Sequence, residues 1–526
     1  MRGGLPAVPD GGWSRAACAV LAGALPALAF PAPAWWWWAY GALVPWMLLV
    51  RRAPTVRRAA LDGWLGGAGF LLAAHHWLMP SLHVFIVLLV AVLGLLWAPW
   101  GVLVRHLLRG SPGVRRGVAA VFLVPSGWLL VELVRSWQGL GGPWALLGSS
   151  QWQVEPALRV ASVGGVWLVG LLVVAVNTAL TLLVAGAGRR GAVVALAGLV
   201  ACGLVAGAAS WWAPRPAVAG EVRVAVVQPG VHGGPGGAAR RFAAGERLTR
   251  EVADRGVDLV VWGESSVGSD LAARPALAAR LAALARETGA DVLVNVDARR
   301  TDRPGIFKSS VLVGPGGPTG QRYDKMRLVP FGEYVPARSL LGWATSVGRA
   351  AGEDRRRGER QVVMATARAD GRELRFGPLV CFESAFPDMS RRLTRSGAQL
   401  LVAQSATSSF QDSWAPAQHA SLAALRAAEN GRPVVHATLT GVSAVHGPRG
   451  EPVGDRLGTA ERTAAVYAVP LATGRTAYVR YGDWAVHGAL AALAALCAYE
   501  GVRLLRRPPR GRSARTARAS RGRPAR

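Results

Sequence analysis

Long apolar runs occupy most of the first 212 residues of the chain and return once near its end. They cover residues 14–30, 35–50, 61–79, 84–104, 118–134, 160–186, 192–212 and 484–505. Most of them are close to the ~20 residues that an α-helix needs to cross a bilayer. The pattern therefore predicts a polytopic α-helical membrane domain of about eight spans.

The short loops between these runs are rich in arginine. Arginines gather at 51–58, at 105–116, at 189–190 and in the tail after Glu500, whereas only Asp10, Asp62, Glu132 and Glu155 precede Glu221. Basic loops mark the cytoplasmic side of a membrane protein. With eight spans and an N-terminus inside, every basic loop and the tail fall on the cytoplasmic face, and residues 221–483 lie outside.

Composition and charge agree with this topology. With 51% hydrophobic residues and 21 Trp, the chain is too apolar for an ordinary soluble enzyme. The net charge of +29 points to nucleic acid in a soluble protein, but here the basic excess lies in loops and a tail beside apolar runs. We therefore expect the membrane as a partner and no nucleic acid.

Glu132 and Arg135 are charged residues near the outer end of one predicted span. They are three residues apart, which suits an ion pair along one helix face. The alternative is that Glu132 orients a lipid headgroup, because charged groups within spans are often functional.

Between residues 221 and 470 the pattern changes to short apolar strands that alternate with helices. Strands are expected at 222–228, 257–262, 291–296, 310–313, 361–365, 374–380, 399–404, 433–438 and 463–469. Helices are expected at 238–255, 271–288 and 416–429. This alternation is typical of a layered α/β domain. We thus divide the chain into a membrane domain (1–214, seven helices), an extracytoplasmic α/β domain (221–470), a last transmembrane helix (484–505) and a basic cytoplasmic tail (506–526).

Cys381 is the first candidate for chemistry in the α/β region. It ends the apolar run 374–380, just before a position where a helix can begin, so its thiol is expected near backbone N–H groups, which suits a nucleophile. The alternative is a buried structural cysteine. Cys18, Cys202 and Cys497 lie inside apolar runs, which leaves Cys381 without a disulfide partner or a metal-binding spacing, and we expect no metal site.

Two further residues accompany Cys381. Glu264 follows the apolar run 257–262, and reactive groups of layered α/β domains collect at such strand ends. Lys325 lies between them in the segment 323–336, and Lys308 is the only other lysine among 60 basic residues. Almost every basic residue of this chain is arginine. A lysine therefore marks a position that needs a compact ammonium group whose pKa can be adjusted. Lys308 has no motif around it, which weakens the inference for Lys325.

These stretches resemble the carbon–nitrogen hydrolase (nitrilase) superfamily, which has a Glu-Lys-Cys triad at the strand ends of an αββα sandwich. Together with the apolar runs, the resemblance narrows to the apolipoprotein N-acyltransferase family and covers nearly the whole chain. Its marks are Leu-Val-Pro-Phe-Gly-Glu-Tyr-Val-Pro at 328–336, Cys-Phe-Glu at 381–383, Gly-Arg-Pro at 431–433 and Gly-Pro-Trp at 142–144. The resemblance implies a nitrilase-like catalytic domain in a bacterial plasma membrane protein.

The resemblance also implies a two-stage acyl transfer that needs no metal or cofactor. Glu264 acts as general base on Cys381, and the thiolate takes an acyl chain from a phospholipid as a thioester. Lys325 and a backbone N–H near Phe382 stabilise the oxyanion. The N-terminal amine of an S-diacylglyceryl-cysteine in a lipoprotein then accepts the chain. The implied partners are a phospholipid donor and a lipoprotein acceptor, and we expect a monomer.

Supporting residues follow from the same resemblance, and so do departures from it. Glu333 and Glu383 match positions that hold the site, by orienting Lys325 or the incoming amine, although either fits a structural carboxylate equally well. Phe382 stands where the family usually has tyrosine. The segment 405–413 lacks the family's Asn, Asp and Trp, and Leu439 replaces a later Asn.

These departures keep two other functions open. The first is a membrane-anchored hydrolase of the same superfamily, because the loss of amine-positioning groups in 405–413 lets water compete. The second is a catalytically weak paralogue that binds lipoproteins, against which the complete set of Glu264, Lys325 and Cys381 argues.

Overall fold

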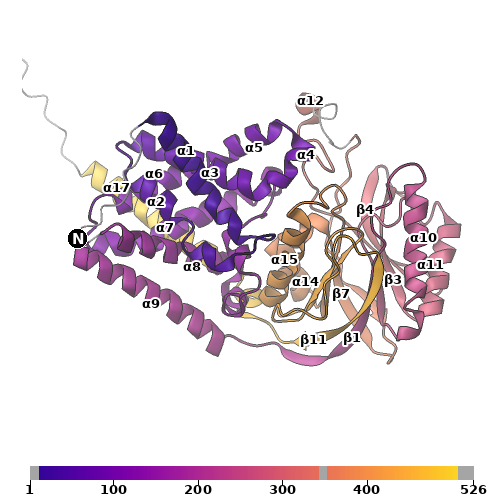
Figure 1. Ribbon diagram of the computed structural model, residues 1–526. Coiled ribbons are helices and arrows are strands. Elements are labelled where there is room, and N and C mark those ends of the chain that lie inside the picture. Colours follow the sequence, from indigo (N-terminus) through magenta and orange to yellow (C-terminus); the bar gives the residue numbers. More distant parts are fainter. Residues whose placement is uncertain (1–10, 187, 343–351, 507–526) are drawn as a thin grey trace, which may run out of the picture.

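The computed structural model of the protein describes residues 11–186, 188–342 and 352–506. Two parts lie side by side (Figure 1). One is a helical bundle built from described residues between 11 and 212 and from the last helix, and the other is an α/β domain from residues between them. The predicted basic tail 506–526 lies outside the described residues except for Arg506.

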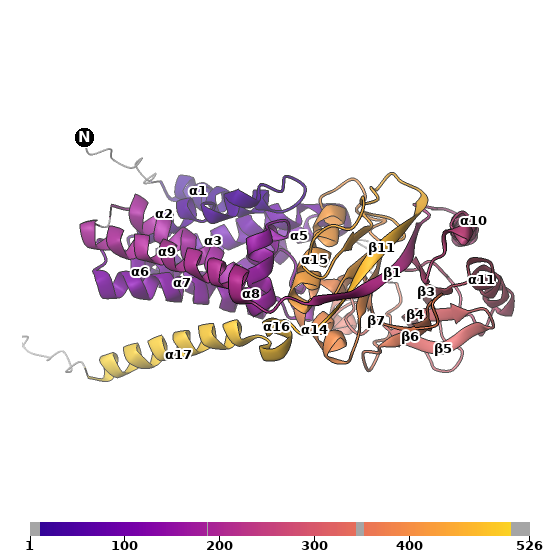
Figure 2. The ribbon, with the colours of Figure 1, turned by 90° about the horizontal axis from the view of Figure 1, so that it is seen from below.

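The bundle combines long helices with short 3-10 turns. Its main elements are α1 (Gly12–Ala24), η1 (Leu25–Ala29), η2 (Trp36–Tyr40), α2 (Val44–Arg51), α3 (Val56–His75), η3 (His76–Leu78), α4 (Met79–Leu82), α5 (Phe85–Gly94), α6 (Trp97–Leu108), α7 (Val114–Arg135), η4 (Gln138–Leu140), η5 (Leu147–Gln151), α8 (Glu155–Val184), α9 (Gly188–Trp212) and α17 (Trp484–Leu505). Figure 2 shows α17 running back along the bundle, away from the α/β domain.

The number of clear spanning helices is smaller than the eight expected. Among the described residues, five helical segments are long and apolar enough to cross a membrane: 12–29, α7, α8, α9 and α17. A sixth crossing results if α5 and α6, bent by 41° where they meet, count as one span. The run 35–50 is divided into η2 and the eight-residue α2, and the run 61–79 belongs mainly to α3, which carries Arg57, Arg58 and Asp62. The expected eight apolar runs therefore do not form eight uninterrupted spanning helices among the described residues.

Aromatic side chains and glycines form the centre of the bundle. Trp46, Trp100 and Trp128 are buried, and their ring centroids lie 4.9–5.9 Å apart. A Cβ added to Gly66 of α3 would lie 2.1 Å from the Trp46 ring. Such small residues let helices approach closely, so α3 packs tightly against α2.

The α/β domain is a sandwich of two sheets with helices on both outer faces. The alternating pattern predicted a layered α/β domain, and the family resemblance implied the two-sheet sandwich. One sheet has the strand order β11-β1-β2-β3-β4-β5, and the other has the order β10-β9-β8-β7-β6. The strands are β1 (Ala217–Gln228), β2 (Leu259–Trp262), β3 (Asp291–Arg299), β4 (Ile306–Gly314), β5 (Gly317–Asp324), β6 (Met364–Ala367), β7 (Glu373–Val380), β8 (Leu400–Ser405), β9 (Val434–Thr438), β10 (Ala444–His446) and β11 (Thr463–Thr473). Apolar side chains of both sheets meet in one core between them.

The helices of the two outer layers have different neighbours. In Figures 1 and 2, α10 (Gly237–Arg250) and α11 (Pro275–Thr288) cover the six-stranded sheet on the side away from the bundle. By contrast, α14 (Pro387–Arg395) and α15 (Ala415–Asn430) lie between the five-stranded sheet and the bundle. The five-stranded sheet, which carries Cys381, is therefore the one nearer to the membrane helices.

Polar contacts fix α15 to the bundle. Glu429 of α15 accepts a hydrogen bond from the backbone N–H of Val166 at 2.7 Å, and Arg426 donates to Glu429 at 2.8 Å. The free N–H arises because α8 is interrupted at Gly164 and Gly165, where Gly165 has a φ of 70°. Such a break leaves backbone donors without helical partners. The interruption of α8 thus provides an attachment point for the α/β domain.

Candidate active site at the junction of the two domains

Cys381 lies at the turn between β7 and the 3-10 helix η7 (Cys381–Ala385). Its φ of 50° is left-handed, which is unfavourable for a residue with a Cβ and is often seen at functional turns. Two side chains hold the turn: Ser384 donates to the carbonyl of Cys381 at 2.9 Å, and Nε2 of His419 lies 3.1 Å from the same oxygen. Cys381 as a residue is neither fully buried nor exposed.

Glu264 follows β2 in the other sheet. Its backbone N–H donates to the carbonyl of Ser405 at 3.1 Å, and a Cβ added to the preceding Gly263 would lie 1.9 Å from the backbone nitrogen of Leu439. Only glycine therefore allows the end of β2 to approach the end of β9 this closely. The strand ends of both sheets meet at the site, as the sequence predicted for Glu264 and Cys381.

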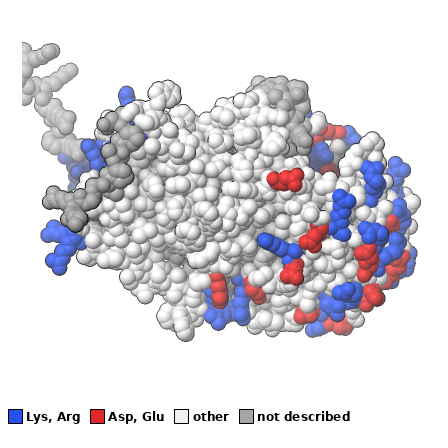
Figure 3. Space-filling model, viewed as in Figure 1, with Lys and Arg blue, Asp and Glu red and all other residues white. Residues whose placement is uncertain are grey.

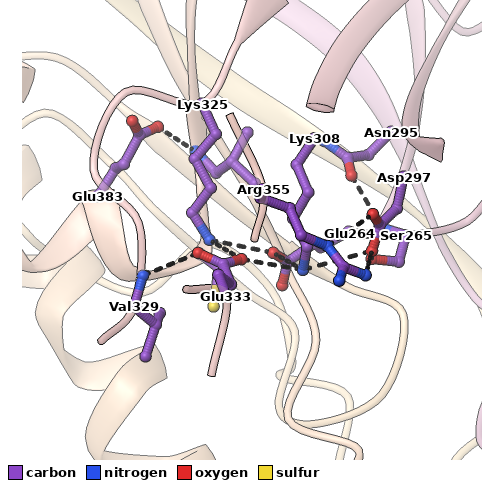
Figure 4. A network of polar contacts seen from close by, with 12 residues as sticks. Glu264, Ser265, Asn295, Asp297, Lys308, Lys325, Val329, Glu333, Arg355 and Glu383 are labelled. Carbon is purple, nitrogen blue, oxygen red and sulfur yellow. Dashed lines mark hydrogen bonds and ion pairs between the residues drawn. The ribbon is translucent and has the colours of Figure 1, made fainter. Parts of the chain in front are cut away.

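Lys325 follows β5 and is fully buried. Its Nζ lies 3.2 Å from Oε1 of Glu264 and 2.7 Å from Oε1 of Glu333. The other oxygen of Glu333 accepts a hydrogen bond from the backbone N–H of Val329 at 2.8 Å, which fixes the carboxylate (Figure 4). Glu333 therefore contacts both Lys325 and the backbone of the 323–336 segment.

Lys308 joins the same group of charges, although no motif pointed to it. Its Nζ lies 2.8 Å from Oε1 of Glu264 and 3.0 Å from Oε1 of Glu333. Figure 4 shows the two lysines reaching the carboxylates from neighbouring positions. The available signal was the rarity of lysine itself, because both lysines of the chain meet at one site.

Burial and neighbouring charges set the protonation of these groups. Burial raises the pKa of Glu264, but Lys308 and Lys325 outweigh it and lower this pKa to about 2. Burial lowers the pKa of Lys325, but Glu264 and Glu333 outweigh it, and the net pKa is raised. Burial also raises the pKa of the Cys381 thiol to about 12, and Glu264 adds to the rise. At neutral pH the group therefore contains two carboxylates, two ammonium groups and a thiol.

Glu383 is buried and follows Cys381 by two residues, and it binds the backbone and Tyr323 rather than Lys325. Its Oε1 accepts from the hydroxyl of Tyr323 at 2.7 Å and from the N–H groups of Met326 and Arg327 at 2.8 and 3.1 Å. Its Oε2 accepts from the N–H of Val380 at 2.8 Å. Glu383 thus ties the segment after Lys325 to the strand that ends at Cys381.

Phe382 connects the site to the membrane bundle. Its ring stacks edge-on against Phe386 at 4.9 Å, and a Cβ added to Gly142 would lie 2.5 Å from the Phe382 ring. Gly142 belongs to the loop after α7, where Arg135 donates to the carbonyls of Trp144 and Ala145 and Glu132 accepts from the N–H of Leu147. Glu132 and Arg135 form no ion pair with each other among the described residues, and both hold this loop instead.

The segment 405–413, which departs from the family pattern, also faces the bundle. The hydroxyls of Ser408 and Thr440 lie 2.8 Å apart, and Phe410 packs edge-on against Trp77 at 5.0 Å. Trp77 and Trp144 both donate to Oε1 of Gln418, at 3.2 and 2.8 Å. Residues of both domains therefore surround the turn of Cys381. Within the described ranges no group of His, Cys, Asp and Glu side chains is arranged to hold a metal ion.

A carbon–nitrogen hydrolase type of domain, joined to a bundle of apolar helices, is the class that this fold and site define. Residues 223–478 match the carbon-nitrogen hydrolase family, and residues 22–179 match the apolipoprotein N-acyltransferase N-terminal domain. The apolipoprotein N-acyltransferase of Geobacter metallireducens is 31% identical over 502 residues, which are 91% of this chain and 94% of that protein. That of Azotobacter vinelandii is 30% identical over 500 residues, 91% of this chain and 93% of that protein. The chain belongs to the apolipoprotein N-acyltransferase family.

Solved structures with similarity to this chain come from the nitrilase superfamily. A mutant of the amidase of Nesterenkonia AN1 is 22% identical with a TM-score of 0.36, covering 52% of this chain and 98% of that one. A branch 10 member of the superfamily from Saccharomyces cerevisiae is 17% identical with a TM-score of 0.38, covering 48% of this chain and 91% of that one.

Proposed function

We propose that the protein transfers a fatty acyl chain from a phospholipid, through a thioester on Cys381, to the N-terminal amine of S-diacylglyceryl-cysteine in bacterial lipoproteins. The observation that carries the proposal is the position of Cys381. The nucleophile lies beside a cluster of carboxylates and ammonium groups, and residues of the membrane bundle surround its turn. A site in this position can meet substrates whose acyl chains stay in the bilayer. Membership of the apolipoprotein N-acyltransferase family supports the same activity.

In the first half-reaction Cys381 attacks the ester carbonyl of the phospholipid. The thiol proton passes to Glu264, and the sulfur forms a bond to the carbonyl carbon. An ammonium has three N–H groups, of which Lys325 uses two on Glu264 and Glu333, so one remains for the tetrahedral oxyanion. The ester C–O bond then breaks, and the leaving lysophospholipid oxygen takes the proton from Glu264.

In the second half-reaction the lipoprotein amine attacks the thioester carbonyl. Glu264 accepts the amine proton, the C–S bond breaks, and the Cys381 sulfur recovers a proton as the amide leaves. Glu264 returns to its carboxylate form after each half-reaction, and Cys381 recovers its thiol after the second. The lysophospholipid leaves before the amine reacts, so the proposed cycle is a ping-pong reaction without metal or cofactor. Glu264, Lys325 and Cys381 form the catalytic triad of this proposal.

Three neighbouring residues support the triad in different ways. Glu333 orients Lys325, because its two oxygens bind Nζ of Lys325 and the N–H of Val329. Glu383 holds the backbone next to Lys325 and Cys381. Phe382 shields the nucleophile on the side of the bundle through its contact with the Gly142 loop.

We further propose eight crossings of the bacterial plasma membrane, with the domain 221–470 on the extracytoplasmic side. The run 35–50 crosses the bundle as η2 and α2 in series: the Trp36 carbonyl accepts from Gln151 just before α8, whereas Arg51 donates to the carbonyls of Leu108 and Gly110 in a basic loop. Helix α3 returns from that side toward the catalytic domain, where the ring of His76 packs against Trp414. The loops rich in arginine lie at the opposite end from the catalytic domain, which fits a cytoplasmic face.

An acyl-acceptor assay separates the possible activities. The purified protein is incubated with phospholipid vesicles and a diacylglyceryl-cysteine peptide, and the products are measured by mass spectrometry. The proposal predicts N-acylated peptide and lysophospholipid in equal amounts. Free fatty acid with unmodified peptide supports the hydrolase, which the altered 405–413 loop favours, and neither product supports the lipoprotein-binding paralogue.

A further inference from the structure

Lys308 and Lys325 are neighbours across two paired strands. Lys308 lies on β4, and its carbonyl accepts a hydrogen bond from the backbone N–H of Lys325, directly after β5, at 2.8 Å. Ser309 and Asp324 form the next pair of the register. Side chains at directly opposed positions of a sheet lie on the same face, so both ammonium groups reach the same two carboxylates.

The four groups form a closed ring of alternating charge. Nζ of Lys308 and Nζ of Lys325 both lie within 3.2 Å of Oε1 of Glu264, and both lie within 3.0 Å of Oε1 of Glu333. Oε2 of Glu264 accepts no hydrogen bond from any described residue, so it is the oxygen that remains for a proton. Two donors on Oε1 fix the orientation of the base and leave Oε2 unoccupied.

Lys308 differs from Lys325 in its surroundings. The side chain of Lys325 is 0% exposed, whereas that of Lys308 is 13% exposed and also lies 3.8 Å from Asp297. Asp297 in turn contacts Arg355 at 3.3 Å and the hydroxyl of Ser265 at 3.3 Å. Lys308 therefore occupies the outer side of the ring, next to further charges, while Lys325 occupies the inner side.

The charge balance of the ring depends on both lysines. With Lys325 alone, two carboxylates would share one ammonium, and the ring would carry a net negative charge beside Cys381. A further negative charge on sulfur is then opposed by the Glu264 and Glu333 carboxylates, both of which raise the pKa of Cys381. Lys308 and Lys325 act in the opposite direction on the same thiol. The second lysine makes the ring neutral before the thiolate forms.

We propose that Lys308 is a positioning residue of the acyl transfer: it holds the base Glu264 by one oxygen and balances the second carboxylate, so that Lys325 can serve the oxyanion. The transfer that it assists is the movement of one proton from Sγ of Cys381 to Oε2 of Glu264. Lys308 contacts no reacting atom in this step. The role of Lys308 in catalysis rests on the proposed function. Its effect on the pKa of the Cys381 thiol can be measured without any substrate.

Thiol reactivity provides a test that needs no phospholipid. The protein in detergent is alkylated with iodoacetamide at pH 8, and the rate at Cys381 is followed by peptide mass mapping. An opposite charge within a few ångströms shifts a pKa by about 1–3 units, so Lys308→Met is expected to slow alkylation about tenfold or more. Lys308→Arg keeps the charge and stays within about threefold of the native rate. The matched control is Arg303→Met, which removes a nearby cation from an exposed pair with Glu359.

The pH profile of acyl transfer provides the second readout. Loss of Lys308 removes a positive charge from Glu264, so the pKa of this base rises from about 2 by about 1–3 units and its protonation begins at a higher pH. Activity of Lys308→Met is therefore lost on acidification toward pH 4, where the native enzyme keeps its activity, and kcat falls while KM is unchanged. A purely structural role predicts a lower Tm with an unchanged profile.

The outcomes separate this proposal from the proposed function. Slow alkylation in Lys308→Met with a native rate in Lys308→Arg supports the role of Lys308, even if no lipid substrate reacts. Equal alkylation rates in folded Lys308→Met and native protein overturn it, whatever the acyltransferase assay shows. If Lys308→Met does not fold, Lys308→Gln takes its place, because it keeps a donor for Glu264 and loses only the charge. Its alkylation rate at Cys381 is then compared with that of the native protein. A failure of both neutral variants to fold, with Lys308→Arg folded, assigns Lys308 to structure and also overturns the proposal.

Discussion

Glu383 shows how one buried carboxylate organises the backbone around Cys381. It accepts hydrogen bonds from one hydroxyl and three backbone N–H groups, and these donors come from both sides of the active site. Burial raises its pKa. The family resemblance left two roles open for Glu383, one in orienting Lys325 or the amine and one as a structural carboxylate. Its contacts favour the structural role, because they join two segments of the backbone.

Replacing Glu383 by glutamine tests this interpretation. An amide nitrogen cannot accept the N–H of Val380 or of Met326, so Glu383→Gln leaves at least one buried donor unpaired and is expected to lower the free energy of unfolding by about 2–4 kcal/mol. Tyr323→Phe removes only one of the four donors, and we expect it to lower the free energy of unfolding by about 1 kcal/mol. Thermal unfolding in detergent measures both variants. If Glu383→Gln is as stable as the native protein, Glu383 does not stabilise the fold by joining these two segments.

The sequence placed two of the proposed site residues well, because strand ends decided their position. Glu264 and Cys381 each end an apolar run, and the structure brings both to the same edge of the sandwich. Lys308 could not be assigned in this way, because it lies inside β4 and meets the carboxylates only through the register of β4 with β5. That register involves β5, a strand rich in Gly and polar residues that the hydrophobic pattern did not reveal.

At the scale of elements, the loop after α7 connects the membrane bundle to η7. Gly141 and Gly142 both have positive φ, at 102° and 71°, so an alanine is strained at either position. A Cβ would meet the Phe382 ring at Gly142, whereas nothing lies within 4 Å of one at Gly141. Comparing substitutions at Gly141 and Gly142 therefore distinguishes the effect of backbone strain from the effect of losing the contact between the domains.

Alanine substitutions at these two glycines give a matched prediction. Gly142→Ala pushes the loop away from Phe382 and is expected to reduce the rate of thioester formation about tenfold or more, because small displacements of a nucleophile are costly. Gly141→Ala carries similar strain without the clash, and its acylation rate is expected to stay close to native. Single-turnover acylation of Cys381 measures both rates. A similar loss in the two variants argues against a role for the contact.

The hydrophobic pattern predicted the long helices better than the short ones. Helices α7, α8, α9 and α17 coincide closely with apolar runs, since the length and composition of each are sufficient for a crossing. The run 35–50 is equally apolar but contains four consecutive tryptophans and Pro45, and it folds as η2 and α2 with Trp46 in the bundle core. Apolar content alone does not distinguish a straight helix from two short segments packed inside a bundle.

At the scale of the whole molecule, charge is distributed along the long axis. On the face drawn in Figure 3, the helical bundle shows almost no charge between its far end, where Lys and Arg gather, and the catalytic domain, which carries both signs. An uncharged band of this kind fits the hydrocarbon region of a bilayer. Buried polar contacts such as that between Glu429 and the N–H of Val166 join the two domains.

Labelling in intact bacterial spheroplasts tests the proposed orientation. A cysteine placed at exposed Glu251 in the catalytic domain is expected to react with a membrane-impermeant maleimide, whereas one placed at exposed Arg115 in a basic loop reacts only after the membrane is opened. The reverse pattern contradicts an extracytoplasmic catalytic domain.

The thioester on Cys381 is the central claim, and intact mass after incubation with phospholipid vesicles tests it most directly. We expect an added fatty acyl mass that neutral hydroxylamine removes, that is absent from Cys381→Ala, and that appears together with lysophospholipid. Glu264→Gln, which keeps the shape of the base and loses its ability to accept a proton, is expected to form the adduct at least about 100-fold more slowly. An adduct that persists in Cys381→Ala, or no adduct and no lysophospholipid with lipids of the native host, contradicts acyl transfer through Cys381.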